Sequence, residues 1–309
     1  MGSSFELAHF RSQIPITRSR SYLFSGALAP AAEPVLSAWN AWSNAWREDP
    51  NSVYTPDALR GSCDSLRTSF AKLIAAEPTG VAITDNTSRA ANIAIRALAR
   101  RPGDNVVVDN STYPSSLYPW YINGAYTSRL VETDDSDDPA GAVAAHIDDD
   151  TVAVCVSHVA PLTGRRHDLS ALSTVAHRHD AVLVVDAAQS TGVVPIDVRR
   201  EGVDILVTTA MKWLLGPPGI GFLYLGPNIL ADAPVLDVGY LGLEGSRAEW
   251  PRDRMPSVSA DARRYELGLP NLPGIVAAQA GLALLMDVGI DNVAGQVQGL
   301  ATRCLDGLA

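Results

Sequence analysis

The sequence has few cysteines and no long apolar run. Its three cysteines, Cys63, Cys155 and Cys304, are too few and too scattered for a disulfide framework or a structural zinc site. Such usage favours a reducing compartment, so the protein is expected to be cytoplasmic. No window approaches the roughly 18 consecutive apolar residues of a membrane-spanning helix, and residues 1–15 contain no apolar run of signal-peptide length. Neither a membrane protein nor a secreted protein is expected.

A basic surplus is also absent. Lysine and arginine total 24, whereas aspartate and glutamate total 34, which gives a net charge of −10. Nucleic acids and anionic membranes attract basic surfaces, so neither is an expected partner. The HExxH, CxxC and Walker motifs are missing, and the glycines of GPPGIG (216–221) lack the spacing of a dinucleotide-binding loop. No metal site is expected, and a nucleotide-binding α/β protein is a weak alternative.

What the sequence does contain is an alternation of strand-like and helix-like segments. Short β-branched runs predict strands, and segments of helical periodicity lie between them, one of them with Asn86 as its N-cap. This alternation is typical of a mostly parallel sheet covered on both faces, so we expect an α/β three-layer sandwich. The predicted strands are 81–85, 105–109, 128–133, 151–159, 181–188, 204–210 and 219–225. The predicted helices are 33–47, 56–77, 87–100, 169–180, 272–289 and 291–308, with another beginning near Pro139.

Three tryptophans mark the first long helix. Trp39, Trp42 and Trp46 are spaced i, i+3, i+7, which places their indoles on one helical face. We interpret this stripe as part of the core or of a dimer interface. Among the histidines, His158 follows a predicted strand and is expected to be structural, and His167 is expected beside a solvated helix face.

Several polar residues follow predicted strands. Thr87 and Ser88 open a helix directly after the first strand, Asp186 and Gln189 follow the fifth, and Lys212 follows the sixth. In an α/β sheet the carboxyl ends of the strands meet at one edge, where ligands bind. Each residue alone is more often a helix cap, a turn residue or a surface charge. Together they favour one cofactor, pyridoxal 5′-phosphate.

The chemistry of this cofactor requires those residue types. Its aldehyde needs an amine for a Schiff base, which Lys212 can supply. Its pyridine nitrogen needs a carboxylate partner such as Asp186. Its phosphate needs hydrogen-bond donors at a helix N-terminus, where Thr87 and Ser88 lie. Tyr113 is a candidate for stacking on the ring, and Gln189 can donate to the ring 3′-oxygen.

Five segments, in their order along the chain, resemble the class V aminotransferase family, which includes cysteine desulfurases and isopenicillin-N-epimerase-like proteins. The resemblance looks strongest to the isopenicillin-N-epimerase-like branch. It implies a pyridoxal-phosphate-dependent enzyme of fold type I, usually a homodimer with the active site at the subunit interface. The segments are DNTSRAANIAIRAL (85–98), SHVAPLTGRRHDL (157–169), DAAQSTG (186–192), TTAMKWLLGPPGIGFLYL (208–225) and ARRYELGLPN (262–271).

The resemblance also implies roles for single residues. Lys212 matches the Schiff-base lysine, Asp186 the partner of the pyridine nitrogen and Gln189 the ligand of the 3′-oxygen. Tyr113 matches the ring-stacking position, which is often a histidine. The phosphate ligands match at Thr87, Ser88 and Thr209.

The chain departs from the family pattern in four ways. Met211 replaces a phosphate-binding histidine, Pro161 replaces an asparagine that reaches the cofactor, and Leu269 replaces a threonine that reaches the partner's phosphate. The phosphate is therefore expected to have fewer donors than is usual. The fourth departure is that the C-terminal small domain, with its carboxylate-binding arginine, is expected to be truncated or missing.

Three parts are predicted: an N-terminal segment and helix (1–50), a large cofactor-binding domain (51–250) and the start of the small domain (251–309). The expected substrate is a small amino acid or amine, gripped partly by Ser25, Gly26 and Ala27. Fold and cofactor do not choose between transamination, elimination, epimerisation and decarboxylation. The alternatives are a catalytically inactive scaffold subunit, and cysteine desulfurase or C–S lyase activity.

Overall fold

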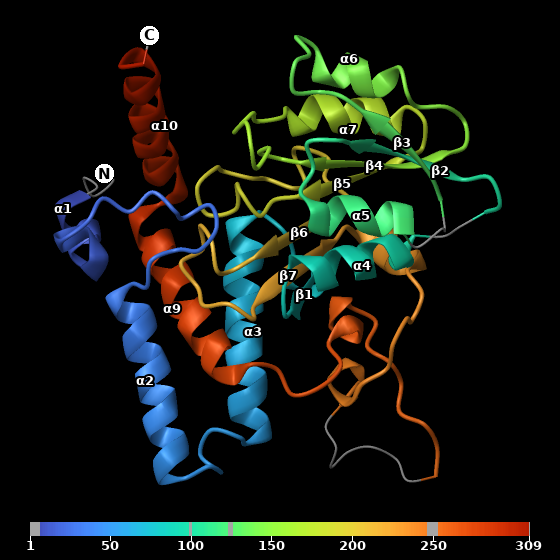
Figure 1. The fold of residues 1–309 in the computed structure, drawn as a ribbon. Coiled ribbons are helices and arrows are strands. Elements are labelled where there is room, and N and C mark those ends of the chain that lie inside the picture. Colours follow the sequence, from blue (N-terminus) through green and yellow to red (C-terminus); the bar gives the residue numbers. More distant parts are fainter. Residues whose placement is uncertain (1–6, 99–100, 123–125, 246–252, 309) are drawn as a thin grey trace.

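The computed structural model describes residues 7–98, 101–122, 126–245 and 253–308, and its centre is one seven-stranded sheet (Figure 1). The strand order is β1-β7-β6-β5-β4-β2-β3. All seven predicted strands are present, each within two residues of its predicted bounds. They are β1 (Val81–Thr84), β2 (Asn105–Asp109), β3 (Thr127–Val131), β4 (Thr151–Ser157), β5 (Val182–Asp186), β6 (Ile205–Thr209) and β7 (Gly221–Leu225).

The sheet is mostly parallel, as predicted. The pairs β2–β3, β2–β4, β4–β5 and β5–β6 are parallel, whereas β7 runs antiparallel to both β6 and β1. Parallel neighbours are usually joined by a crossover helix, whereas residues 210–220 between β6 and β7 contain no helix and turn the chain back on itself. That loop carries Lys212.

Helices cover both faces of the sheet, which makes the three-layer sandwich that the alternation predicts. Successive strand residues point to opposite faces: Val154 and Val156 pack with α3, α6, α7 and α9, whereas Ala153 and Cys155 pack with α4 and α5. The helices are α1 (Leu7–Ser12), α2 (Glu33–Glu48), α3 (Pro56–Leu73), α4 (Thr87–Ala97), α5 (Pro114–Ile122), α6 (Pro139–Ala144), α7 (Leu169–His177), α8 (Pro227–Asp232), α9 (Leu272–Val288) and α10 (Ile290–Asp306).

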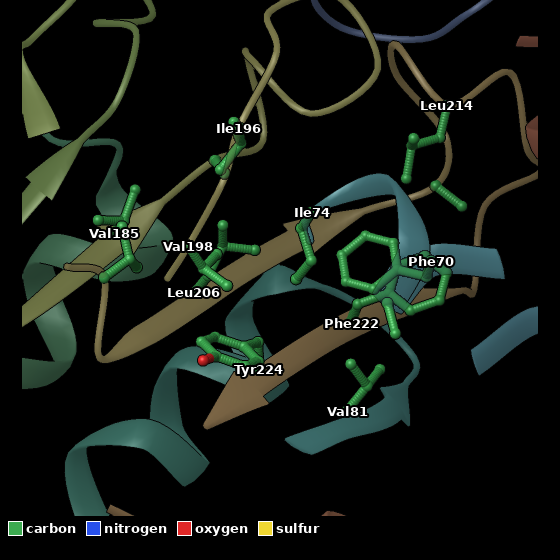
Figure 2. Close-up of a cluster of buried hydrophobic side chains, with 14 of the residues drawn as sticks. Phe70, Ile74, Val81, Val185, Ile196, Val198, Leu206, Leu214, Phe222 and Tyr224 are labelled. Carbon is green, nitrogen blue, oxygen red and sulfur yellow. The ribbon is translucent and has the colours of Figure 1, made fainter. Parts of the chain in front are cut away.

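Two phenylalanines join α3 to the sheet. The rings of Phe70 on α3 and Phe222 on β7 are stacked, with centroids 3.9 Å apart and planes 2° apart (Figure 2). Both side chains are fully buried among the aliphatic residues of that face. Truncating such a side chain costs about 3–5 kcal/mol, so this contact fixes α3 against β7.

Helix α3 ends earlier than residue 77, where the sequence pattern placed its end. Ala75 takes a left-handed conformation (φ 57°), and the N–H of Ala76 donates to the carbonyl of Ala71 at 2.8 Å. This is the hydrogen bond of a Schellman motif, which closes a helix one residue after its C-cap. The motif usually has glycine at the left-handed position, so alanine at position 75 does not signal a helix end.

The tryptophan stripe only partly enters the core. Trp42 packs against the apolar cluster beneath α3 and α9, whereas Trp46 is 56% exposed and Trp39 37% exposed. A core role is therefore confirmed for Trp42 alone. Along the described stretches of chain, no single helix is long and apolar enough to span a membrane; α9 and α10 meet those criteria only as a pair bent by 79°.

Candidate active site

One cavity of about 720 Å³ opens at the carboxyl edge of the sheet. It lies where β1 leads into α4, where β5 ends, and where β6 enters the loop to β7. All seven residues that the sequence analysis assigns to the cofactor line it. They are Thr87, Ser88, Tyr113, Asp186, Gln189, Thr209 and Lys212.

Lys212 reaches the cavity from a tightly packed loop. Gly216 passes so close to Ala210 that an added Cβ would lie 2.7 Å from the Ala210 Cβ, which explains the glycine at this turn. The Lys212 side chain is buried, and its Nζ lies 5.2 Å from the centroid of the Tyr113 ring. Burial lowers the pKa of Lys212, although the charge of Asp186 opposes this. A lowered pKa increases the share of neutral amine, which is the nucleophilic form.

Asp186 is a buried carboxylate with two fixed donors. The Ser116 hydroxyl donates to its Oδ2 at 2.6 Å, and the Ala188 backbone N–H donates to its Oδ1 at 2.9 Å. Burial raises the pKa of Asp186, while both donors and the charge of Lys212 act in the opposite direction. The result is an acidic group held in one orientation, ready to pair with a cation in the cavity.

Gln189 is fixed at both ends of its side-chain amide. Its Nε2 donates to the carbonyl of Gly26 at 2.9 Å, and its Oε1 accepts from the indole Nε1–H of Trp213 at 2.9 Å. Gly26 and Ala27 line the cavity, as the sequence analysis expected, but Ser25 is not among its lining residues.

The N-terminus of α4 brings neutral donors to the cavity. Asn86 caps the helix, as predicted, by accepting from the N–H of Arg89 at 2.8 Å. Thr87 and Ser88 then occupy the first turn, where backbone N–H groups point outward and favour an anion. At the end of β6, the Thr209 hydroxyl donates to the Ile220 carbonyl at 3.2 Å.

Two of the three positions that differ from the family pattern lie at the cavity. Met211 and Pro161 both line the cavity, whereas Leu269 is 55% exposed and lies outside it. Among the described lining residues, Asp186 and Lys212 are the only charged ones. A phosphate group bound here would therefore rely on neutral donors and the α4 helix dipole.

One histidine, His167, lies in a different environment from the one that its sequence position predicts. His167 does not lie on a solvated face: it is buried, and its Nε2 is 3.1 Å from Oδ2 of Asp109 at the end of β2. Burial raises the pKa of Asp109, but the hydrogen bonds from His167 and Ser111 outweigh burial and lower it. His158 is buried beside this pair, and its backbone N–H donates to the Asp186 carbonyl at 2.9 Å.

Two residues of the site were missed at the sequence level. Ser116 lies in α5, a helix that the sequence analysis did not predict because Pro119 interrupts its pattern. Trp213 directly follows the lysine, but no spacing rule connects it with Gln189 or Gly26. Only the loop geometry brings these three residues together.

Comparisons with known proteins match these observations. A family model described as Aminotransferase class-V matches residues 21–309. The chain is 31% identical to an uncharacterized aminotransferase, YcbU, of Bacillus subtilis (strain 168), over 96% of this chain and 77% of that protein. It is 29% identical to a probable cysteine desulfurase of Methanothermobacter thermautotrophicus, over 92% of this chain and 71% of that protein.

Solved structures share the fold. The cysteine desulfurase CsdA of Escherichia coli superposes with a TM-score of 0.85 at 24% identity, over 99% of this chain and 78% of that one. The cystine C–S lyase C-DES superposes with a TM-score of 0.82 at 24% identity, over 90% of this chain and 74% of that one.

Proposed function

The chain belongs to the class V aminotransferase family, whose members are pyridoxal-phosphate-dependent enzymes, and we propose that it acts at the α-carbon of an amino acid or amine. Lys212 is the residue proposed to carry the cofactor. The observation that supports this most directly is the meeting of Lys212, Asp186 and Gln189 in one cavity.

The residues of the cavity fit this cofactor. Lys212 offers an amine of lowered pKa, Asp186 a buried carboxylate for a protonated ring nitrogen, and Tyr113 an aromatic face. The first turn of α4, with Thr87 and Ser88, offers donors for a phosphate.

When bound, pyridoxal phosphate supplies an aldehyde carbon for the lysine and a ring that withdraws electrons from the substrate's α-carbon. Lys212 would hold the cofactor through its amine, and the same amine would be placed to accept or return a proton at the substrate's α-carbon. Asp186 would stabilise a proton on the ring nitrogen, and the Ser116 hydroxyl holds the carboxylate in its orientation. Tyr113 supports one face of the ring.

A single labelling experiment tests this proposal. The protein is loaded with pyridoxal phosphate, reduced with borohydride and digested, and the modified peptide is identified by mass spectrometry. The 309-residue sequence contains only one other lysine, Lys72, which is exposed on α3 and provides a matched control. We expect a yellow protein whose reduced cofactor maps to Lys212, unchanged in Lys72→Arg and lost in Lys212→Ala.

The opposite outcome is equally informative. A colourless protein that gains no absorbance band with added cofactor would support an inactive scaffold subunit instead. For a loaded protein, a screen of amino acids and amines for spectral change then identifies the substrate. No response from any of them would remove the support for catalysis.

A specific second candidate is C–S bond cleavage, because a probable cysteine desulfurase is among the relatives. Two of the three thiols are unsuited to carry a persulfide. Cys63 and Cys155 are buried, and burial raises the pKa of each to about 12, so almost no reactive thiolate forms. Cys304 is exposed on α10. Sulfide release from cysteine, compared with turnover of other amino acids, distinguishes the two activities.

The assembly and compartment are part of the proposal. We propose a homodimer with its active site at the subunit interface, in which a partner chain adds to the few phosphate donors. The exposed Trp39 and Trp46 are candidates for that interface. The absence of disulfides among the three free cysteines is compatible with the cytoplasm.

A further inference from the structure

We propose that Trp213 is a positioning residue that holds the side-chain amide of Gln189 in one orientation and ties it to the N-terminal segment at the cavity mouth. The inference rests on the proposed function for the identity of the cofactor. Its structural part, the link between Trp213, Gln189 and Gly26, does not depend on the cofactor.

The two hydrogen bonds of Gln189 agree on one orientation. The indole of Trp213 can only donate, and it meets Oε1 at 2.9 Å; the carbonyl of Gly26 can only accept, and it meets Nε2 at 2.9 Å. Flipping the amide would place two donors together at Trp213 and two acceptors together at Gly26. Each partner therefore opposes the flip independently.

This orientation leaves one donor for the cavity. The Nε2 nitrogen carries two hydrogens, and Gly26 takes one of them. Because Gln189 lines the cavity, the second hydrogen is available to an acceptor there, such as the cofactor's 3′-oxygen. Losing the Trp213 hydrogen bond leaves Gly26 as the remaining partner that orients the amide, so the amide is held less firmly and that donation weakens.

The same hydrogen bonds fasten the wall of the cavity mouth. Leu23 and Phe24 line the cavity although both are largely exposed, so few packing contacts hold them. Their segment is closed on itself by the Tyr22 hydroxyl, which donates to the Leu28 carbonyl at 2.7 Å. The Gln189–Gly26 bond attaches it to the residues after β5, and Gln189 is bonded in turn to Trp213 of the lysine loop. The Ala29 N–H attaches it to the lysine loop directly by donating to the Met211 carbonyl at 2.7 Å.

The backbone of Trp213 is held without its indole. Gly192 (φ 98°) packs so closely that an added Cβ would lie 2.6 Å from the Trp213 carbonyl oxygen. Replacing the indole by a benzene ring therefore removes the donor while the loop stays in place. Trp213→Phe is the informative variant.

The first test uses the cofactor-free protein. We expect the indole N–H of Trp213 to exchange with solvent faster in Gln189→Leu than in wild type, by at least about threefold. The free energy that corresponds to a threefold change is less than one hydrogen bond typically contributes. The other tryptophans of the chain are internal controls whose exchange stays unchanged. Equal exchange of the Trp213 indole in both proteins would overturn the inference, whatever the cofactor proves to be.

The second test uses the protein loaded with pyridoxal phosphate. It measures the midpoint of the pH titration of the absorbance band that the cofactor gives when it is linked to Lys212. When the nitrogen that links Lys212 to the cofactor carries a proton, that proton partly neutralises the negative charge on the 3′-oxygen. When the nitrogen has lost its proton, the oxygen depends more on another donor. A donor such as Gln189 therefore stabilises the deprotonated form. Trp213→Phe should therefore raise the midpoint, by about half a pH unit or more, which is a fraction of a charged hydrogen bond. Trp42→Phe, at a position packed against the apolar core and outside the cavity, should leave it unchanged.

A double variant separates positioning from a general structural effect. If Trp213 acts through Gln189, Trp213→Phe should add little to the midpoint shift of Gln189→Leu. Full addition of the two shifts, or no shift in Trp213→Phe, would overturn the inference while the proposed function stands. A wild-type protein that takes up no cofactor would overturn the proposed function and the cofactor part of this inference together.

Discussion

The amine of Lys212 lies over the aromatic face of Tyr113, with Nζ 5.2 Å from the ring centroid. The two residues come from different connections of the sheet: Tyr113 precedes α5, and Lys212 lies between β6 and β7. A cation over an aromatic ring is attracted by the ring's negative face. The same face is available to an aromatic ring bound at that amine.

Tyr113 is expected to contribute stacking energy to cofactor binding, independently of its hydroxyl. Tyr113→Ala should raise the dissociation constant of pyridoxal phosphate about twofold to tenfold, because aromatic stacking is worth about 0.5–1.5 kcal/mol beyond buried area. Tyr113→Phe keeps the ring and should stay within about twofold of wild type. Titration of the cofactor-free proteins measures both constants, and equal weakening in the two variants would contradict a stacking role.

Ser116 is expected to control the acid limit of cofactor binding. Burial raises the pKa of Asp186, and the Ser116 hydroxyl at 2.6 Å is one of the contacts that lower it. Ser116→Ala removes that donor, so the pKa rises further and Asp186 becomes neutral at a higher pH. A hydrogen bond to a charged group is worth about 1.5–3 kcal/mol, which corresponds to a shift of about one to two pH units.

The measurement is the dissociation constant of pyridoxal phosphate as a function of pH. Its acid-side midpoint should move upward in Ser116→Ala. Ser170→Ala removes an exposed hydroxyl on α7 and is the matched control. A midpoint that moves downward, or moves equally in the control, would show that Asp186 does not set this limit.

Much of the fold could be predicted because its signals are local. Each buried strand, such as NVVVD at 105–109, is a short β-branched run, and both faces of the sheet are covered, so few positions break the pattern. Helix α5 was not predicted, because Pro114 and Pro119 disrupt the local helical pattern. The helix forms nonetheless, since Trp120 packs against the sheet. The division into parts at residues 50 and 250 stays a prediction.

The candidate site was predictable only as far as chemistry constrains residue type. Lys212 and Asp186 could be found because a specific reaction needs an amine and a carboxylate after particular strands. Ser116 and Trp213 act on those residues through hydrogen bonds across the fold, and many residue types could do the same. The burial of His167 against Asp109 is likewise a long-range pairing with no trace in sequence spacing.

A buried ion pair is expected to hold the segment after residue 261 against β1. Arg67 on α3 lies with Nη2 2.9 Å from both carboxylate oxygens of Glu266, which also accepts from the Ile83 N–H at 2.8 Å. Removing one partner leaves a buried charge unpaired, so Arg67→Met should lower the free energy of unfolding by about 3–5 kcal/mol. Urea denaturation measures this loss.

The pairing itself is tested by a double-mutant cycle. Arg67→Met combined with Glu266→Leu should cost clearly less than the sum of the two single changes. Arg47, which faces Glu48 at 3.9 Å on an exposed surface, is the control, and Arg47→Met should cost less than about 1 kcal/mol. Strict additivity at positions 67 and 266 would indicate that the two charges do not stabilise each other.

His158 is expected to make the fold sensitive to acid. Burial lowers its pKa from 6.5 to about 4, and the charges of Arg166 and His167 add to this. Between these two pH values the unfolded chain binds a proton at this position and the folded chain does not, so stability is intact above about pH 6.5 and falls as the pH drops. The loss of folding free energy from pH 7 to about pH 4.5 should reach about 2–3 kcal/mol from this residue.

In His158→Asn that part of the pH dependence should vanish, whereas His179→Gln, at an exposed position, should keep the wild-type profile. Urea unfolding at several pH values compares the three proteins, and a slope in His158→Asn as steep as that of wild type would assign the acid sensitivity to other groups.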